Sequence, residues 1–342
     1  MRYPEFLHKN GTIGFIAPSF GCTIEPYRAC FQESKRKLRS KGYRTVTGPN
    51  CYSCDGIGKS SSPENCAAEI NDFFLNDRCD AIISCGGGET MCEDLAFVDF
   101  EGIRGAKPKW YMGYSDNTNL TFTLPLLCDT AAIYGPCAPS FAMRPWHPAI
   151  SDALGVLTGR KLEVSNYDGW ESCSLKDADD PFTPYNITEE PCIKVINAPA
   201  EDEAFSGRLL GGCLDCLSIL CGTKYDKVRE FEEKYRGDGI LWFLECCDLN
   251  PLGMRRSLWQ LAEAGWFDTA KGFLIGRPLH FDEEILGMDR INAVTGVLER
   301  YGVPIVLDAD LGHLPPSMPL ISGACADVRA ADGALSVKFK LL

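Results

Sequence analysis

Ser115 is the first residue of this sequence whose setting points to covalent chemistry. It directly follows the apolar run Trp110–Tyr114 and precedes a helical pattern from about 117 to 127. A hydroxyl at such a strand-to-helix turn resembles a nucleophile elbow, with the backbone N–H of Asp116 exposed at the start of the helix. The run Gly113–Asn117 lacks the second glycine of the G-x-S-x-G pattern. Helix capping by Ser115 or Asp116 is the alternative interpretation.

A run of three glycines forms a second candidate element for binding or catalysis. Asp80–Ser84 reads as a buried strand, and Cys85-Gly-Gly-Gly-Glu-Thr90 follows it directly. Because glycine has no Cβ, the backbone N–H groups of this turn can approach a ligand closely and stabilise an oxyanion. The pattern is neither G-x-G-x-x-G nor a P-loop with its lysine. A plain strand-to-helix turn is the alternative.

A serine nucleophile needs a general base, and histidine suits this role near neutral pH. Of the four histidines, His280 and His313 each follow a predicted strand, and periodicity does not choose between them. A carboxylate at a strand end is needed to fix the histidine tautomer. Glu245 closes the otherwise apolar run Gly239–Glu245, where a carboxylate is rarely buried without a partner. Asp248 is the nearby competitor for this role.

Alternating strand and helix patterns position these candidates in the first half of the chain. Strands are expected at 12–16, 43–47, 80–84 and 110–114, and helices at about 25–40, 63–75 and 117–127. Such alternation indicates a parallel sheet flanked by helices. In sheets of this kind, reactive groups gather at the carboxyl ends of the strands, where both Ser115 and the glycine turn are expected.

Regular patterns resume after a polar stretch that is rich in turn-forming residues. Beyond it, helices are expected at 215–221, about 254–262 and 289–301, strands at 239–245, 272–275 and 304–308, and a hairpin at 326–339. The chain of 342 residues exceeds the usual size of one core. We therefore predict an α/β protein with an N-terminal parallel-sheet domain at 1–160 and a linker or active-site flap at 161–191. A mixed α/β C-terminal domain at 192–342, ending in a β-hairpin, completes it.

Composition excludes several classes of partner. The net charge of −13, from 34 basic and 47 acidic residues, is opposite to what binding of DNA, RNA or an anionic membrane requires. No window approaches the ~18 uninterrupted apolar residues of a membrane span. The first ten residues lack the apolar stretch of a secretory signal, so a cytoplasmic location is expected.

The eighteen cysteines are expected to be structural or incidental thiols. Cys51–Cys54 and Cys213–Cys216 both have CxxC spacing, but a zinc ribbon pairs two such knuckles at close separation. Here they lie far apart, and the second falls in a helical pattern. Many unpaired thiols without a secretion signal fit a reducing compartment. Neither a metal site nor a cofactor is expected.

Five segments together resemble the LD-carboxypeptidase family of serine peptidases. They are Gly113–Thr118, the glycine turn followed by Glu-Thr, Gly207-Arg-Leu-Leu-Gly-Gly212, the strand ending at Glu245, and Gly312-His313. Each motif is weak alone, but the five occur in the family's order and span about 11–322. The resemblance implies Ser115 as nucleophile, His313 as general base and Glu245 as orienting acid, with the triad divided between two domains and no metal. It also implies an oxyanion site made by the backbone N–H groups of Gly87, Gly88 and Asp116.

Within this family the chain is similar to the microcin C self-immunity branch. That branch hydrolyses the amide between an aminoacyl group and a modified nucleotide, and an aromatic residue in its insert stacks on the base. Trp170 is the candidate for this contact, and a place in the domain junction is the alternative. The branch is expected to carry a polar amide residue after Gly212, whereas this chain has Cys213, a departure at a candidate substrate-binding position.

Three functions follow from these residues. The first is a serine amidase that hydrolyses small aminoacyl-nucleotide compounds through an acyl-enzyme, with His313 taking the proton of Ser115. The second is a muropeptide LD-carboxypeptidase, and the third is a non-catalytic protein that binds a small ligand. The sequence leaves the substrate and the oligomeric state open, with a homodimer as the assembly considered.

Overall fold

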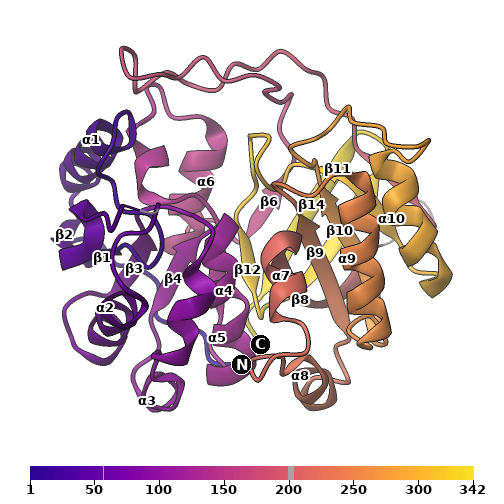
Figure 1. Ribbon diagram of the computed structural model, residues 1–342, viewed down its shortest axis with the longest axis horizontal. Helices are drawn as coiled ribbons and strands as arrows, with labels where there is room; N and C mark the ends of the chain where they lie inside the picture. Colours follow the sequence, from indigo (N-terminus) through magenta and orange to yellow (C-terminus); the bar gives the residue numbers. More distant parts are fainter. Residues whose placement is uncertain (57, 199–203) are drawn as a thin grey trace.

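A six-stranded sheet organises the N-terminal half of the molecule (Figure 1). The structure is a computed structural model that describes residues 1–56, 58–198 and 204–342. The strands of this sheet are β1 (Thr12–Ile16), β2 (Arg44–Thr47), β3 (Ala81–Ser84), β4 (Trp110–Gly113), β5 (Ala132–Tyr134) and β12 (Leu320–Ser322). They lie in the order β12-β5-β4-β3-β1-β2, and only the β12–β5 pair is antiparallel. The carboxyl ends of β3 and β4 therefore meet at one edge, as expected for the candidate site.

Helices connect the strands of this first sheet. They are α1 (Tyr27–Ser40), α2 (Pro63–Leu75), α3 (Phe100–Gly105), α4 (Thr118–Thr121), α5 (Thr123–Cys128) and α6 (Pro148–Leu157), with 3-10 turns at Pro49–Tyr52, Met91–Ala96, Ser115–Asn117 and Ala138–Ala142. Helix α2 begins where the sequence indicates, because the Asn65 N–H donates to Ser62 Oγ at 3.4 Å. The helix predicted at 117–127 is interrupted between α4 and α5, since Pro125 has no N–H to bond to Thr121.

An eight-stranded sheet organises the C-terminal half. Its order is β6-β14-β13-β8-β9-β10-β11-β7, with β6 (Glu163–Ser165), β7 (Lys194–Ile196), β8 (Phe205–Cys213), β9 (Ile240–Glu245), β10 (Ala270–Gly276), β11 (Ile305–Ala309), β13 (Cys325–Ala331) and β14 (Ala334–Lys340). Strands β8 to β11 are parallel, and β13 with β14 forms the predicted terminal hairpin. The helices are α7 (Leu214–Leu220), α8 (Val228–Lys234), α9 (Pro251–Glu263) and α10 (Arg290–Leu298), followed by a 3-10 turn at Glu299–Tyr301.

The two halves share strands and core. Strand β12 returns from the C-terminal half to pair with β5. Strand β6, which lies inside the predicted linker, and β7, which follows it, both pair in the C-terminal sheet. One buried cluster contains Ile133 of β5, Leu209 of β8 and Phe243 of β9. The α/β fold with two sheets is as predicted, but the sheets do not divide the chain at a single position.

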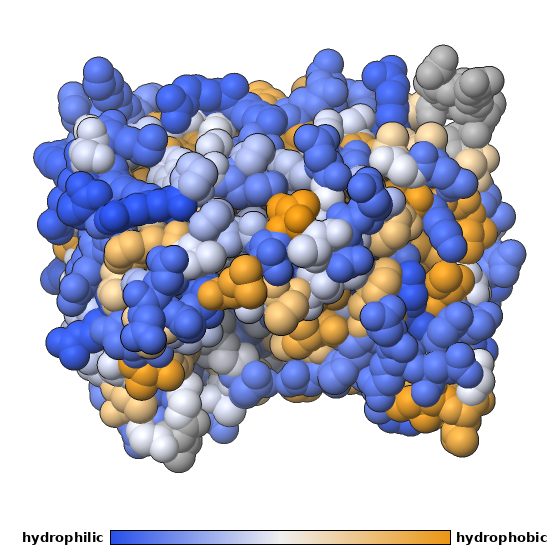
Figure 2. All heavy atoms as spheres, turned by 90° about the horizontal axis from the view of Figure 1, so that it is seen from above, coloured by the Kyte–Doolittle hydropathy of each residue, from blue (hydrophilic) through white to orange (hydrophobic). Residues whose placement is uncertain are grey.

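An extended segment from about 171 to 192 crosses between the halves at the top of Figure 1. The Phe182 carbonyl accepts the Arg144 N–H at 2.8 Å, and the Glu171 N–H donates to the Pro315 carbonyl at 2.8 Å, so the segment contacts both halves. Seen from this side, the surface is mostly hydrophilic, with apolar residues in separate groups (Figure 2). No helix in the described part of the chain is long and apolar enough to cross a membrane.

Candidate active site

The turn that carries Ser115 is held in an unusual backbone conformation. Ser115 has a φ of +63°, in the left-handed region that residues other than glycine rarely adopt. Its N–H donates to the Tyr134 hydroxyl at 3.1 Å. The Asn117 side-chain amide donates to the carbonyls of Gly86 and Tyr114, both at 2.9 Å. These bonds stabilise a tight strand-to-helix turn of the kind that presents a nucleophile.

Three side chains from separate elements form a continuous hydrogen-bonded chain. His313 Nε2 lies 3.0 Å from Ser115 Oγ, and His313 Nδ1 lies 2.8 Å from Glu245 Oε2. Ser115 follows β4, Glu245 is the last residue of β9, and His313 lies in the loop after β11. The arrangement is that expected for the nucleophile, base and orienting acid of a catalytic triad, with its members drawn from both halves.

Glu245 is buried and has a second partner besides His313. Its side chain is 2% exposed, and the Tyr134 hydroxyl donates to Oε1. Gly312 approaches it so closely that a Cβ there would lie 2.6 Å from Oε2, and Gly312 has a φ of +106°. Glycine at this position therefore lets the His313 loop pass over the carboxylate.

Glu245 and His313 each shift the pKa of the other toward its charged form. Burial alone raises the pKa of Glu245, but the His313 imidazolium and the bonds from His313 and Tyr134 bring it below its usual value. Burial alone lowers the pKa of His313, but the Glu245 carboxylate and the nearby Cys247 raise it well above its usual value. When the His313 ring is neutral, the ionised Glu245 fixes its proton on Nδ1, so that Nε2 faces the serine as a strong base.

A buried arginine supports the loop that carries His313. Arg277 is completely buried, forms an ion pair with Asp310, and donates from Nη2 to the carbonyls of Leu314 at 3.0 Å and Pro316 at 3.2 Å. These carbonyls belong to the first and third residues after His313. The orientation of the imidazole therefore depends on a buried ion pair that has hydrogen bonds to the same loop.

The predicted oxyanion residues lie beside the nucleophile. A Cβ built on Gly87 would be 3.0 Å from Ser115 Oγ and 3.7 Å from the Asp116 nitrogen. The Asp116 carboxylate points elsewhere, because Oδ2 accepts bonds from the Ser19 hydroxyl at 2.6 Å and the Met91 N–H at 3.0 Å. Only the backbone of Asp116 is thus placed for an oxyanion. That the N–H groups of Gly87, Gly88 and Asp116 bind one stays a prediction.

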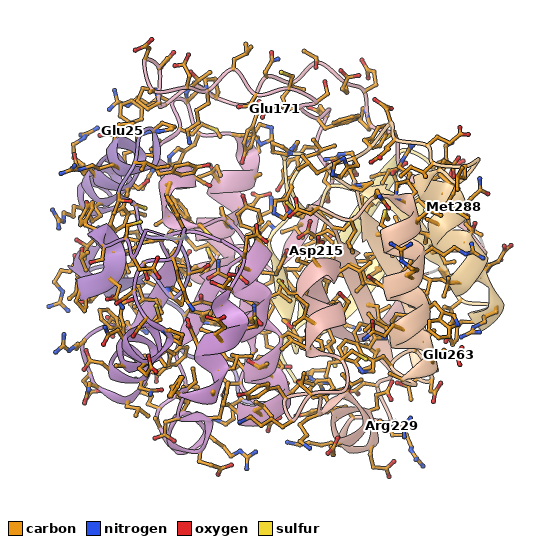
Figure 3. All side chains as sticks on the ribbon, in the orientation of Figure 1. Glu25, Glu171, Asp215, Arg229, Glu263 and Met288 are labelled. Atoms are coloured by element: carbon orange, nitrogen blue, oxygen red, sulfur yellow. The ribbon has the colours of Figure 1, made fainter. Side chains whose placement is uncertain are left out.

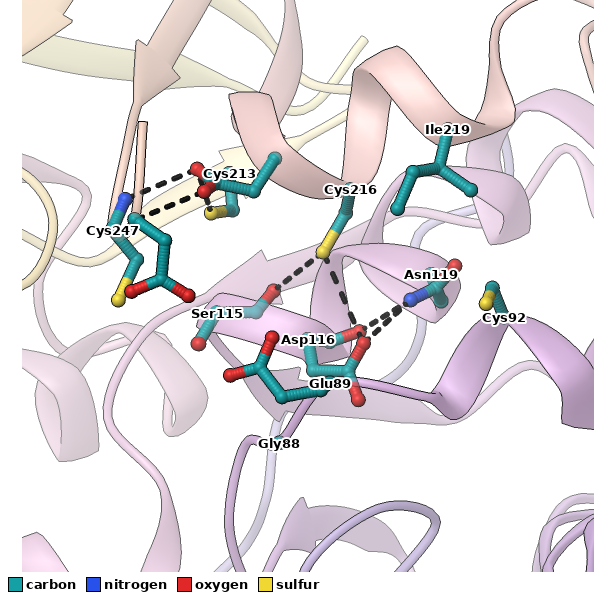
Figure 4. Close-up of a pocket in the computed structure, with 12 residues that line it drawn as sticks. Gly88, Glu89, Cys92, Ser115, Asp116, Asn119, Cys213, Cys216, Ile219 and Cys247 are labelled. Carbon is teal, nitrogen blue, oxygen red and sulfur yellow. Dashed lines mark hydrogen bonds between the residues drawn. The ribbon is translucent and has the colours of Figure 1, made fainter. Parts of the chain in front are cut away.

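Ser115 lies between two cavities of different character. The larger, of about 510 Å³, contains the rings of Phe20, Tyr27, Tyr114 and Tyr185 together with His313 and the glycine turn. The smaller, of about 40 Å³, is lined by Ser115, carboxylates and thiols (Figure 4). A cavity of several hundred Å³ with aromatic walls and a few polar groups is typical of a small-molecule site.

Trp170 is not among the residues that line either cavity. It is 5% exposed, its ring packs against Phe281 at 4.8 Å between centroids, and Nε1 donates to the Glu190 carbonyl at 3.0 Å. The Arg277 guanidinium lies 5.2 Å from the centroid of the ring. This placement fits the alternative, a tryptophan in the domain junction, rather than a platform for a base. Stacking by Trp170 is not supported by its position.

The remaining candidates have clear positions. Cys213 lines the small cavity, with Sγ 3.3 Å from Asp215 Oδ2. Asp248 lines the same cavity, and the His313 ring is hydrogen-bonded to Ser115 and Glu245. His280 pairs with Glu283 at 3.3 Å on the surface. All eighteen cysteines, each of which the structure describes, are free thiols. Among the described residues, no group of three or more His, Cys, Asp or Glu side chains could hold a metal ion.

Two residues of the candidate site were not identified by the sequence analysis. Tyr134 joins the Ser115 backbone to Glu245, and Tyr185 of the crossing segment lines the large cavity. Tyr134 ends an apolar run, Ala131–Tyr134, which is the same strand-end signal that identified Glu245. Tyr185 lies in an irregular segment and carries no such signal.

Comparison with known proteins places this site in a family. The chain is 25% identical over 322 residues to the microcin C7 self-immunity protein MccF of Escherichia coli, covering 91% of this chain and 88% of that protein. It is similar in fold to the MccF-like protein from Bacillus anthracis strain Ames, with a TM-score of 0.84, 21% identity and coverage of 99% and 100%. MccF in complex with aspartyl sulfamoyl adenosine gives a TM-score of 0.82 at 21% identity, covering 100% of both chains.

The ranges that match the family domains include the three residues of the candidate triad. Residues 13–135 match the LD-carboxypeptidase N-terminal domain, and residues 206–328 match the LD-carboxypeptidase C-terminal domain. Ser115 lies in the first range, and Glu245 and His313 lie in the second. The chain belongs to the LD-carboxypeptidase family.

Proposed function

We propose that this chain is a serine hydrolase that cleaves the amide of small aminoacyl-nucleotide compounds through Ser115, His313 and Glu245. The observation that carries the proposal is the hydrogen-bonded chain from Ser115 Oγ through His313 to Glu245 Oε2, at 3.0 and 2.8 Å. A protein that only binds a ligand has no need for such an arrangement on a turn with a positive φ at its serine.

The reaction follows from this geometry. Ser115 Oγ attacks the carbonyl carbon while His313 Nε2 accepts its proton, and the resulting oxyanion is placed beside the backbone of Gly87 and Asp116. The carbon–nitrogen bond then breaks, and His313 returns the proton to the departing nitrogen. Water adds to the Ser115 ester with His313 again as base, which releases the acid and restores the enzyme.

The large cavity supports a nucleotide as the leaving group. Solved structures of MccF hold aspartyl sulfamoyl adenosine and glutamyl sulfamoyl guanosine, and both are similar in fold to this chain. Here Phe20, Tyr27, Tyr114 and Tyr185 surround a cavity of about 510 Å³ beside Ser115. Aromatic rings are the groups that stack on a nucleobase, and Tyr185 of the crossing segment takes the place first expected for Trp170.

The family name supports a second substrate class. LD-carboxypeptidases release a terminal D-amino acid from a muropeptide, and both domains of this chain match that family. The same triad serves either substrate, because both reactions are amide hydrolyses. A homodimer stays a prediction in either case.

Hydrolysis of matched substrates tests the proposal. Aminoacyl sulfamoyl adenosines and a muropeptide tetrapeptide are incubated with the protein, and the products are measured by mass spectrometry. We expect turnover of the nucleoside compounds, and Ser115→Ala should lower kcat by on the order of 10⁶. Ser53→Ala, at a half-buried residue that follows a 3-10 turn and lines neither cavity, is the matched control. Turnover of the muropeptide alone favours the second class, and Ser115→Ala activity within tenfold of the unchanged protein contradicts the triad.

A further inference from the structure

The small cavity beside Ser115 is lined by carboxylates and contains no basic side chain. The carboxylates are those of Glu89, Asp116, Asp215 and Asp248, and no lysine, arginine or histidine is among the described residues that line it (Figure 4). Asp215 lies near the boundary between the two halves of the molecule (Figure 3). The nucleophile therefore has aromatic rings on one side and a concentration of negative charge on the other.

Two of the four carboxylates are satisfied inside the protein. Asp116 accepts bonds from Ser19 and Met91, and Asp215 accepts the N–H groups of Cys247 at 3.1 Å and Asp248 at 2.9 Å. These bonds stabilise the charges where they stand but do not neutralise them.

The other two carboxylates, of Glu89 and Asp248, are exposed at the mouth of the cavity. Neither forms an ion pair with a lysine or arginine of the described chain. Burial raises the pKa of Glu89, and the carboxylates of Asp248, Asp116 and Asp215 raise it further, whereas the His313 ring outside this cavity lowers it. Among the described residues that line the cavity, no basic side chain offsets its negative potential.

An unpaired acceptor on a residue that lines the same cavity points independently to a hydrogen-bond donor in the ligand. Asn119 is 1% exposed and lines the cavity, and its Nδ2 donates to the backbone oxygen and Oδ1 of Asp116, both at 2.9 Å. These two acceptors fix the orientation of the amide. Oδ1 of Asn119 is buried and has no hydrogen-bond partner among the described residues. A buried acceptor left unpaired is unfavourable, and a ligand N–H would satisfy it.

The size of the cavity limits the group that it can hold. Its volume of about 40 Å³ compares with roughly 10–15 Å³ for one ordered water on the same measure. The cavity therefore holds a group of two or three heavy atoms, such as an ammonium and the carbon that carries it. Gly88, Glu89, Ser115 and Cys247 line both cavities, so one substrate can reach into both from the nucleophile.

We propose that the small cavity is a subsite for a primary ammonium group on the acyl part of the substrate, so that the enzyme prefers cationic acyl groups. This inference rests on the proposed function, because Ser115 as nucleophile defines which part of the substrate lies there. Both an α-ammonium and the side-chain ammonium of a lysine-like residue have this chemistry. An acyl group with an acidic side chain is disfavoured, because the four acidic residues that line the cavity repel its carboxylate.

Serine-reactive probes test this preference without requiring a nucleotide substrate. Diphenyl phosphonate analogues of lysine and norleucine, each with a free or an acetylated α-amino group, phosphonylate Ser115 with loss of phenol. The rate constants of labelling are measured by intact mass spectrometry. We expect the probes with an ammonium to react about tenfold faster than acetyl-norleucine. If the norleucine probe with a free α-amino group reacts fast, the subsite binds the α-ammonium. If the acetyl-lysine probe reacts fast, the subsite binds the side-chain ammonium.

Charge-neutral variants test the carboxylates. Glu89→Gln combined with Asp248→Asn should lower the preference for cationic probes by about fivefold. Glu101→Gln combined with Glu284→Gln removes the same charge from exposed positions outside the cavity and should leave the preference intact. Equal rates for the four probes, or an unchanged preference in the first double variant, overturn the subsite while the proposed hydrolase stands. Labelling of Ser115 by none of the probes overturns the serine mechanism and, with it, the subsite.

Discussion

The two halves of the molecule hold their catalytic groups by different means. In the N-terminal half, neutral groups hold Ser115: its φ is positive, its N–H donates to the Tyr134 hydroxyl, and the Asn117 side-chain amide donates to two main-chain carbonyls. In the C-terminal half, side chains hold the acid and base, since Glu245 depends on Tyr134 and the His313 loop on Arg277. The position of Ser115 therefore depends on neutral hydrogen bonds of its own turn, whereas the acid and base depend on buried charges, those of Glu245 and Arg277.

Among the residues that support Ser115 and His313, replacing the orienting acid should have the largest effect. Glu245→Gln keeps the shape of the side chain but lets the imidazole adopt the wrong tautomer, so kcat/KM should fall by about 10⁴. Because the Glu245 carboxylate raises the pKa of His313 and the neutral ring is the base, the ascending limb of the pH profile should move to lower pH. Glu232→Gln, at a buried carboxylate outside the site, should change neither kcat/KM nor the pH of the ascending limb. A limb that stays at the same pH contradicts the assignment of Glu245.

Breaking the buried ion pair under the His313 loop should mainly affect stability. Arg277→Met leaves the buried Asp310 carboxylate without its partner, which should lower the free energy of unfolding by about 3–5 kcal/mol. Denaturant unfolding measures this loss. Arg300→Met removes an exposed pair with Glu263 and should cost less than about 1 kcal/mol. Equal losses in the two variants would show that the buried pair does not support the loop.

Tyr134 links the two halves and should have an intermediate effect on catalysis. Tyr134→Phe removes a donor to a charged acceptor, a bond worth about 1.5–3 kcal/mol, and leaves the Ser115 N–H without its partner. We expect kcat to fall by roughly ten- to a hundredfold with little change in KM. Tyr235→Phe, which removes a tyrosine–aspartate bond far from the site, is the control. A rise in KM alone would place Tyr134 in substrate binding instead.

The aromatic residues of the crossing segment should give the smallest and most selective effect. Tyr185→Ala should lower kcat/KM for aminoacyl nucleosides by roughly tenfold, because base stacking contributes about 1–3 kcal/mol, and should change muropeptide cleavage little. Trp170→Ala should instead lower the melting temperature, because its ring is buried against Phe281. If Trp170→Ala instead lowers cleavage of the aminoacyl nucleosides and Tyr185→Ala does not, Trp170 is the residue that stacks on the base.

Strand ends were predictable from the sequence because they leave a local signal. Ser115 and Glu245 each follow or close an apolar run, and both lie where a parallel sheet places them. The choice of His313 over His280 needed the resemblance to a family, since both follow strands. Strand β8 was not predicted, because its three glycines weaken the strand pattern of Gly207–Cys213.

Long-range packing left no such signal. The ring of Trp170 meets Phe281, more than one hundred residues later, so its burial could not be read from the surrounding polar segment. The return of β12 to the first sheet is likewise set by pairing with β5 across the two halves. Tertiary contacts of this kind decide between a binding residue and a structural one with the same local sequence.

Detection of the covalent intermediate tests the central claim most directly. The protein is mixed with an aminoacyl sulfamoyl adenosine, quenched in acid within the first turnover, digested, and analysed by mass spectrometry. The account predicts a peptide that carries the acyl group as an ester on Ser115, absent from Ser115→Ala. Product formation by Ser115→Ala at a rate close to that of the unchanged protein, with no acylated serine in either, would contradict the triad and the function built on it.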